Sequence, residues 1–344
     1  MKLLNPSPQQ TATLVQALYA VVTAQGSMAA LPLDVASIDA IQRHMLLQQT
    51  PLAAGAATTL PADLEVVLDT PELRRQTVRF MVILAVIDRK ILPAKVDVVE
   101  AAAARLQVDE FGLKLLRHAA HGKFKSIAFG LMTRFVNWWS PTGKARFADW
   151  MQFLWWMLPV LHGEKTRTKN RELATRYAAL ASLPDGSFGK TLLDFYTTFG
   201  ISLPGEPKSV PWAMHEVCHV LSGYGVSLES ELWLTAFIGG SQEETCLDQI
   251  LFGLLSYHVG KQIVLGVISE GLFSPEPYFR AMARGASINV DLVNGWDLWE
   301  VAEVPIHELR ARYKLPPIST WELERISLNN GLLTGPGHPM PTFA

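Results

Sequence analysis

The stretch His215-Glu216-Val217-Cys218-His219 is followed by the turn Ser222-Gly223-Tyr224-Gly225 and by a second apolar run that starts at Leu228. Two histidines four positions apart lie one above the other on a single helix face. The glycine-containing turn ends this helix and lets the next one fold back, which brings Glu231 toward the two imidazoles. Two imidazoles and one carboxylate leave a coordination position open, as in reactive rather than closed structural metal sites.

Outward from this helix pair, apolar residues recur at helical spacing, and no stretch shows the strict alternation of a β-strand. We therefore predict an all-α fold. The expected helices cover residues 12–24, 64–68, 78–87, 93–106, 108–121, 171–182, 192–199, 210–222, 228–238, 245–268, 277–284 and 306–313. The expected organisation is an N-terminal helical domain over 1–125, aromatic-rich connecting helices over 126–170, and a metal-binding domain over 171–344.

Composition narrows the classes of function. The 344 residues are 49% hydrophobic and 18% charged, with a formal net charge of −2 and no basic block, so we expect no nucleic-acid partner. Two cysteines suit a reducing compartment better than a disulfide framework. Residues 1–10 lack the blocks of a signal peptide, and no apolar run reaches the roughly 20 residues of a spanning helix. We expect a cytoplasmic protein that can associate peripherally with the inner face of the membrane.

The stretch from Ala85 to Lys95, AVIDRKILPAK, resembles the central loop of tellurite-resistance TerB-like domains. In that family an aliphatic helix, Asp-Gly and an acidic second helix recur, and the resemblance covers about residues 61–128. Arg89 stands where the family has Gly, and Lys95 stands where it usually has Glu, so the family's acidic metal site is not carried over. A generic helical bundle used for docking accounts equally well for the pattern.

Aromatic residues crowd into residues 126–162, and basic residues are interleaved with them. Such a segment suits either packing between domains or a membrane interface, and we favour packing because clustered aromatic side chains bury a large apolar area. The tryptophans of this segment are Trp138, Trp139, Trp150, Trp155 and Trp156.

Three motifs in the C-terminal half occur in the order found in one family. LPDGSFG at 183–189, with Phe195 after it, resembles that family's LPxGTFG…F motif. HEVCH at 215–219 with Glu231 resembles its HDxxH-x11-E signature, and Arg284-Gly285, Trp299-Glu300, Pro305 and Leu309-Arg310 resemble its RG…WE…PLxELR. The family is the coenzyme Q biosynthesis protein Coq-four with its bacterial relatives, and the resemblance covers about residues 171–317.

The resemblance implies an all-α, zinc-dependent protein of ubiquinone synthesis that replaces the ring carboxyl group of a prenylated aromatic precursor with a hydroxyl. Zinc, or another divalent metal, would be held by His215, His219 and Glu231, and Glu216 would take the place of the family's Asp. The partners that we expect are the prenylated precursor, other enzymes of the pathway, a membrane surface and a second copy of the chain.

Several roles stay open at this point. Glu216 is our candidate catalytic residue, as a proton carrier, but it can also orient a ligand or bind the metal itself. Glu229 competes with Glu231 as third ligand, because it lies only two residues away. His258 and Arg284 are candidate substrate-binding residues. Apolar residues between 251 and 267 would either line a tunnel for an isoprenoid tail or pack in the core.

Two other functions fit the same sequence. Glu216 completes a literal HExxH, which is typical of zinc peptidases, although no edge strand is visible to bind an extended peptide. The chain can also be a non-catalytic scaffold that binds isoprenoid lipids. Metal content separates the enzymes from a metal-free scaffold.

Overall fold

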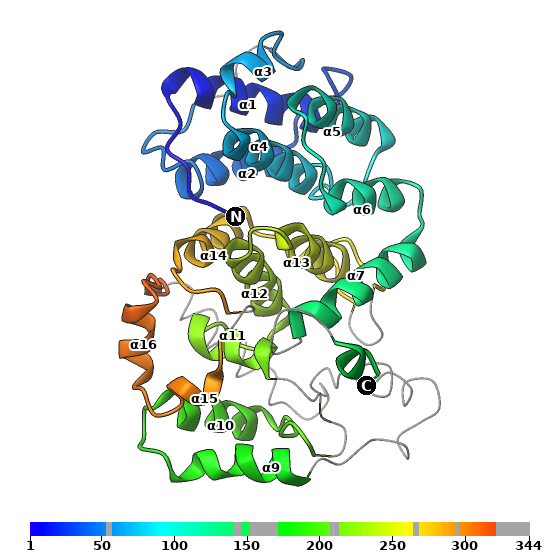
Figure 1. Ribbon diagram of the computed structural model, residues 1–344. Helices are drawn as coiled ribbons and strands as arrows, with labels where there is room; N and C mark the ends of the chain where they lie inside the picture. Colours follow the sequence, from blue (N-terminus) through cyan, green and yellow to red (C-terminus); the bar gives the residue numbers. More distant parts are fainter. Residues whose placement is uncertain are drawn as a thin grey trace. The chain divides into compact units, whose positions relative to one another are not determined.

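The computed structural model of the protein is helical (Figure 1). It describes residues 1–52, 57–139, 146–151, 171–206, 209, 213–263, 268–292 and 296–320. These residues contain no β-strand, only two isolated bridges that join Ser187 to Pro305 and Val259 to Glu270. The predicted all-α fold is confirmed.

The chain divides into two compact units. Unit 1 comprises residues 1–131 and 231–287, and unit 2 comprises residues 132–230 and 288–344. The domain boundaries expected from the sequence were drawn between motifs, whereas these two units are defined by contacts in the folded chain. By contacts, residues 231–287 belong with the N-terminal residues. Much of the expected connecting region, residues 140–145 and 152–170, lies outside the described residues, including Trp155 and Trp156.

The helices of unit 1 come from both of its segments. The first segment forms α1 (Pro8–Val22), α2 (Pro32–His44), α3 (Leu64–Val67), α4 (Pro71–Leu84), α5 (Pro93–Leu106), α6 (Phe111–Ala120) and the start of α7 (Phe124–Trp139). The second forms most of α12 (Leu228–Ser241), then α13 (Cys246–Gly253), a π-helical turn η3 (Leu254–His258) and α14 (Pro275–Ser287).

Proline begins several of these helices, among them α1, α2, α4 and α5. Its fixed φ suits the first helical position, and its missing N–H is not needed there. Ser7 and Thr70 add side-chain caps to α1 and α4. Helix α4 is buried from Val78 to Leu84 and packs against α1, α2, α5 and α6, so it forms the centre of the N-terminal core.

The two segments of unit 1 share this core. Helix α14 packs against α2, and α13 packs against α4 and α6. At the first of these contacts the Glu276 carboxylate accepts hydrogen bonds from His44 at 2.7 Å and from Arg43 at 2.9 Å.

Glycines allow α12 to lie close to α13 and α14, between which it appears in Figure 1. A Cβ added at Gly285 would overlap the main-chain carbonyl of Phe237, and one at Gly240 would overlap the main chain of Met282. Gly285 belongs to the Arg284-Gly285 motif, so close helix packing accounts for that glycine.

The helix expected over 245–268 is wrong in its second half. The α-helix ends at Gly253, the π-helical turn ends at His258, and Gly260 follows with a φ of +72°. This left-handed conformation favours glycine and stops the helix. Val259 then pairs with Glu270. Of the proposed tunnel-lining residues, Leu251, Leu254, Leu255 and Ile263 are buried in the core and Phe252 is partly exposed, whereas Val264 and Val267 lie outside the described residues.

The loop that resembles TerB-like domains contains a buried ion pair. The Lys95 ammonium lies 2.7 Å from the Asp88 carboxylate, and the two side chains are only 1% and 3% exposed. A buried charge is stable only when it is paired and hydrogen-bonded, so each of these residues requires the other.

Unit 2 has shorter helices. They are α9 (Arg171–Ala178), the 3-10 turn η2 (Ala179–Ser182), α10 (Phe188–Phe199), α11 (Met214–Ser222), α15 (Leu298–Val301) and α16 (Ile306–Arg312). Main-chain hydrogen bonds join the start of α10 to the residues before α16, and the start of α16 to the residues before α10. Phe188 N–H donates to the Val304 carbonyl at 2.8 Å, and Ile306 N–H donates to the Gly186 carbonyl at 2.9 Å.

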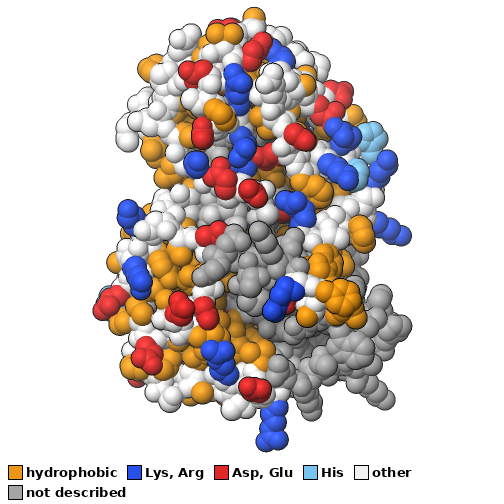
Figure 2. Space-filling view, in the orientation of Figure 1, with side chains coloured by type: hydrophobic (Ala, Val, Ile, Leu, Met, Phe, Trp, Pro, Cys, Tyr) orange, Lys and Arg blue, Asp and Glu red, His pale blue; other side chains and the backbone are white. Residues whose placement is uncertain are grey.

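The face in Figure 2 shows acidic and basic side chains interspersed, with apolar groups between them, in agreement with the small net charge of −2. In the part of the chain that the structure describes, no helix is long and apolar enough to cross a bilayer.

Candidate metal centre

Helix α11 carries both histidines on one face, four residues apart. It ends at Ser222, as the sequence predicts, and is capped by Gly223, whose φ of +82° is left-handed. The Gly223 N–H donates to the His219 carbonyl at 2.8 Å, which completes the last turn of the helix.

The imidazole of His219 is fixed in one tautomer. Its Nδ1 lies 3.1 Å from the Tyr224 carbonyl oxygen. A carbonyl oxygen only accepts hydrogen bonds, so Nδ1 carries the proton and Nε2 presents its lone pair. Histidines that bind metals commonly donate their second nitrogen to a carbonyl in this way.

The lone pair of His219 points at the second histidine. The Nε2 atoms of His215 and His219 are 3.1 Å apart, and the two rings are nearly perpendicular, at 84°. Two nitrogens bound at about 2.0–2.1 Å to one tetrahedral zinc ion lie roughly 3.3 Å apart. The pair therefore already has the spacing of two ligands on a single ion.

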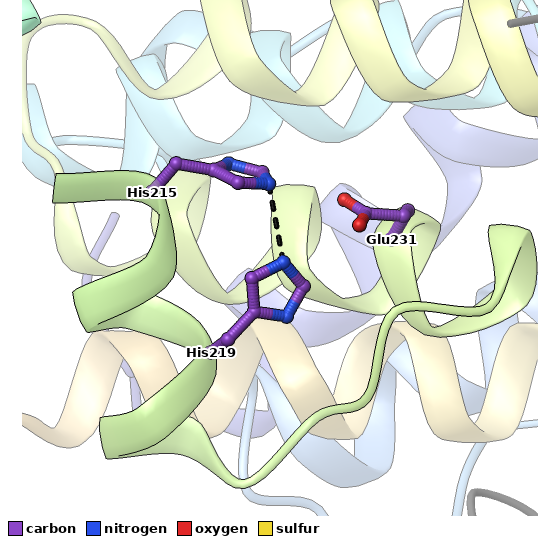
Figure 3. A group of neighbouring side chains, drawn as sticks. All are labelled: His215, His219 and Glu231. Carbon is purple, nitrogen blue, oxygen red and sulfur yellow. Dashed lines mark hydrogen bonds between the residues drawn. The ribbon is translucent and has the colours of Figure 1, made fainter. Parts of the chain in front are cut away.

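The third candidate ligand atom comes from Glu231, in the first turn of α12. The candidate ligand atoms of His215, His219 and Glu231 all lie within 4.8 Å of one another, and the three side chains converge in Figure 3. His219 and Glu231 are 2% and 4% exposed, whereas His215 is partly exposed. Two neutral nitrogens and one carboxylate oxygen form a donor set that suits zinc and similar divalent ions.

The start of α12 is fixed by a serine cap. Ser227 Oγ accepts from the Ser230 N–H at 3.2 Å and donates to Ser230 Oγ at 2.9 Å. This cap sets the first turn of the helix and so the direction in which Glu231 projects. The convergent group contains Glu231 and not Glu229, which agrees with the ligand chosen from the spacing.

Glu216 lies elsewhere. Its side chain is buried and faces Tyr196 and Tyr177, and its Oε2 has no hydrogen-bond partner among the described residues. Burial raises the pKa of the Tyr196 hydroxyl, and the nearby Glu216 carboxylate, which is hydrogen-bonded to it, raises that pKa further. Glu216 is not a member of the convergent group of possible ligands. Its candidate catalytic role stays a prediction.

His258, a candidate substrate-binding residue, is engaged with the main chain through both nitrogens. Its Nε2 lies 2.6 Å from the Ile87 carbonyl, and its Nδ1 accepts from the Phe273 N–H at 3.2 Å. The imidazole therefore links the π-helical turn to the loop after α4 within unit 1, and neither nitrogen is left for a ligand.

Two other residues singled out in the sequence are buried. Arg284, the second candidate for substrate binding, is 4% exposed on α14. The Cys218 thiol is 2% exposed, and burial raises its pKa, which suits an inert packed cysteine. Cys246 is also a free, buried thiol, so the described structure contains no disulfide between the two cysteines.

Two contacts to α11 were not expected from the sequence. The Phe195 ring is stacked on the His219 imidazole, with centroids 5.2 Å apart. The Arg310 guanidinium donates to the carbonyls of Val220 and Leu221. Phe195 and Arg310 both belong to the motifs that resemble the Coq-four family. Nothing else in the sequence indicated that they would contact α11.

A scan against protein-family models, a search of curated proteins and a search of solved structures each find no match. Evidence for function therefore comes from the chain's own residues, from their motifs and from the geometry of this site.

Proposed function

We propose that this protein binds a divalent metal, zinc first, through His215, His219 and Glu231, and that it is an enzyme of the Coq-four type. One observation carries the proposal: the His219 tautomer directs its Nε2 lone pair toward His215 Nε2 at 3.1 Å, with Glu231 in the same group. The 3.1 Å contact is a hydrogen bond between the two imidazoles, and a shared cation would replace it with one bond from each nitrogen.

The proposed substrate is a prenylated aromatic acid of ubiquinone synthesis, whose ring carboxyl group is replaced by a hydroxyl. The exchange releases carbon dioxide and removes two electrons from the substrate, so an oxidant such as dioxygen must take part. When bound, the metal would supply a positive charge that holds a carboxylate or phenolate oxygen. The substrate class comes from the motif resemblance, and the metal site is compatible with it.

The chain's own residues have separate tasks in this proposal. The Tyr224 carbonyl holds His219 in its ligand tautomer, and Phe195 covers one face of that imidazole. Ser227 sets the turn from which Glu231 reaches the site. Glu216 would move a proton, and the neighbouring Tyr196 hydroxyl is the group through which it would do so.

The position of Glu216 weighs against the zinc peptidase alternative. In HExxH peptidases the glutamate between the histidines activates a water molecule on the metal. Here the Glu216 carboxylate lies with Tyr177 and Tyr196 and outside the ligand group. The described residues also provide no β-strand edge for an extended peptide.

Elemental analysis of the purified protein tests the metal site. We expect about one zinc or similar ion per chain, lost in His215→Ala and in Glu231→Gln. Glu229→Gln is the matched control, because it removes a carboxylate of the same helix that lies outside the ligand group. A wild-type protein that stays metal-free after reconstitution would overturn the proposal and favour the lipid-binding scaffold.

Quinone profiling tests the reaction separately. A strain that lacks the gene should accumulate a prenylated aromatic acid and lose ubiquinone, and wild-type protein but not His219→Ala should restore it. Normal quinone levels in the deletion strain, with metal present in the purified protein, would reject the substrate and keep the metal site.

A further inference from the structure

Arg310 reaches from α16 to the end of the metal-binding helix. Its Nε donates to the Leu221 carbonyl at 2.9 Å, and its NH2 group donates to the Val220 carbonyl at 2.7 Å. The neighbouring Leu309 is fully buried and anchors α16 in unit 2. A single rigid guanidinium thus holds two consecutive carbonyls of a helix that lies about 90 residues earlier in the chain.

These two carbonyls belong to the last turn of α11. The last four carbonyls of a helix have no partner inside it, and the helix dipole makes this end negative. A cation that also donates hydrogen bonds gives these carbonyls a partner and also offsets the negative charge of the helix end. The planar fork of arginine can satisfy two acceptors at once in a fixed geometry, which a lysine ammonium on a flexible stem does not reproduce.

The turn that follows these carbonyls fixes the ligand His219. After Leu221 the chain passes through Ser222 and Gly223 to Tyr224, whose carbonyl accepts from His219 Nδ1 at 3.1 Å. The turn is short, and Tyr224 is only 1% exposed. The Arg310 contact holds the beginning of this turn, and the burial of Tyr224 holds its end. Together they fix the position of the Tyr224 carbonyl.

We propose that Arg310 is a positioning residue of the metal centre. By holding the Val220 and Leu221 carbonyls it fixes the turn to Tyr224, and this turn keeps His219 in the tautomer that presents Nε2 to the metal. The inference depends on the proposed metal site and adds a residue that touches neither the metal nor a metal ligand's side chain. Groups that hydrogen-bond a ligand directly, as the Tyr224 carbonyl does with His219, typically contribute 10–100-fold to metal affinity, and Arg310 acts through that group, so its own contribution should be smaller.

Chelator competition on the full-length protein tests the inference, with Arg310→Ala, Arg310→Lys and the wild type compared. We expect Arg310→Ala to bind zinc about 3-fold to 10-fold more weakly, below the 10–100-fold of a direct partner, and Arg310→Lys to lie between it and the wild type. Arg312→Ala is the matched control, since Arg312 is an exposed arginine on the same short helix, and it should bind as the wild type does.

The cobalt-substituted proteins separate a positioning role from a general loss of stability. Cobalt(II) absorption bands report the geometry of the ligands, so Arg310→Ala at saturating cobalt should show shifted or weakened bands while far-ultraviolet circular dichroism stays helical. If Arg310→Ala does not fold, the zinc affinity and cobalt bands of Arg310→Lys are compared with those of the wild type instead. Wild-type affinity and wild-type bands in the folded Arg310 variants would overturn the inference, whereas a metal-free wild type would overturn the proposed function itself.

Discussion

The aromatic ring of Phe195 lies against the imidazole of His219, with ring centroids 5.2 Å apart and planes inclined by 25°. Helix α10 thus supplies a near-parallel surface for a candidate ligand on α11. Together with the hydrogen bond from His219 Nδ1 to the Tyr224 carbonyl, this contact restricts both the plane of the imidazole and its rotation.

Removing the Phe195 ring should loosen the metal site without abolishing it. Aromatic pairs contribute about 0.5–1.5 kcal/mol beyond their buried area, so Phe195→Ala should weaken metal binding by roughly 2-fold to 12-fold. Phe199→Ala serves as the control, since the Phe199 ring contacts Phe195 and not His219 in the described structure. Equal affinities of the wild type and Phe195→Ala in chelator competition would show that the stacking has no part in binding.

Glu216→Gln should keep the metal. The Glu216 side chain lies with Tyr177 and Tyr196 and outside the convergent ligand group, so loss of its charge leaves the three ligands in place. Elemental analysis should therefore give the wild-type stoichiometry. Loss of metal would return Glu216 to the ligand set. Given retained metal, lost turnover supports the proton-carrying role and unchanged turnover rejects it.

Bound metal should stabilise the fold against heat. A ligand at about 100 times its dissociation constant adds roughly 2.7 kcal/mol to the free energy of unfolding, provided that it binds the folded state alone. Calorimetry with and without a chelator should show a higher unfolding temperature for the metal-loaded protein, and no such difference in His219→Ala. The exposed His307 offers the control variant His307→Ala, which should keep the wild-type response.

Acid should remove one contribution to the stability of unit 1. Burial alone would raise the pKa of Glu276, but hydrogen bonds from His44, Arg280 and Arg43 outweigh it and lower that pKa from 4.5 to about 2. The ionised carboxylate therefore stabilises the folded state above about pH 4.5, and this stabilisation is lost as the pH falls toward 2. The carboxylate is 43% exposed, so after solvent screening we expect about 1 kcal/mol or less.

Urea unfolding at several pH values checks this prediction. The wild type should be more stable than Glu276→Gln at pH 6, and the difference should disappear near pH 2. A difference that does not change with pH would mean that the carboxylate's charge is not the cause.

Gly285→Ala should destabilise the packing of α14 against α12. The added Cβ would overlap the Phe237 carbonyl, and a main-chain group cannot move aside as a side chain can. Overpacking of this kind costs about 1–3 kcal/mol or more. Gly130→Ala is the contrast, because its nearest contact is the end of the Phe111 ring at 3.1 Å, and we expect its stability to stay near that of the wild type. Thermal unfolding of the two variants should therefore diverge.

Local signals were sufficient for several elements. Helix α5 has the bounds expected from the sequence, Pro93 to Leu106, because proline marks its first position. Helix α12 begins at Leu228 as expected. The convergence of His215, His219 and Glu231 was also predictable, since they lie within one helix, one turn and the start of the next helix.

Features that require distant partners were not predictable. Apolar residues recur at helical spacing on both sides of Gly260, and the helix stops because Gly260 turns left-handed and Val259 pairs with Glu270. The contact of Arg310 with Leu221 joins residues 89 positions apart, which no local pattern indicates. The direction of Glu216 likewise depends on where α9 and α10 place Tyr177 and Tyr196.

The buried ion pair of Lys95 and Asp88 bears on how the protein would respond to a shortage of metal ions. A lysine carries its positive charge as part of the chain, so the loop after α4 has a permanent counter-ion that never has to be acquired from the medium. The proposed metal site at His215, His219 and Glu231, in contrast, would depend on a supply of ions from outside. Under the proposed function, a shortage of zinc would therefore empty the metal site and stop the reaction while the N-terminal helices stay folded.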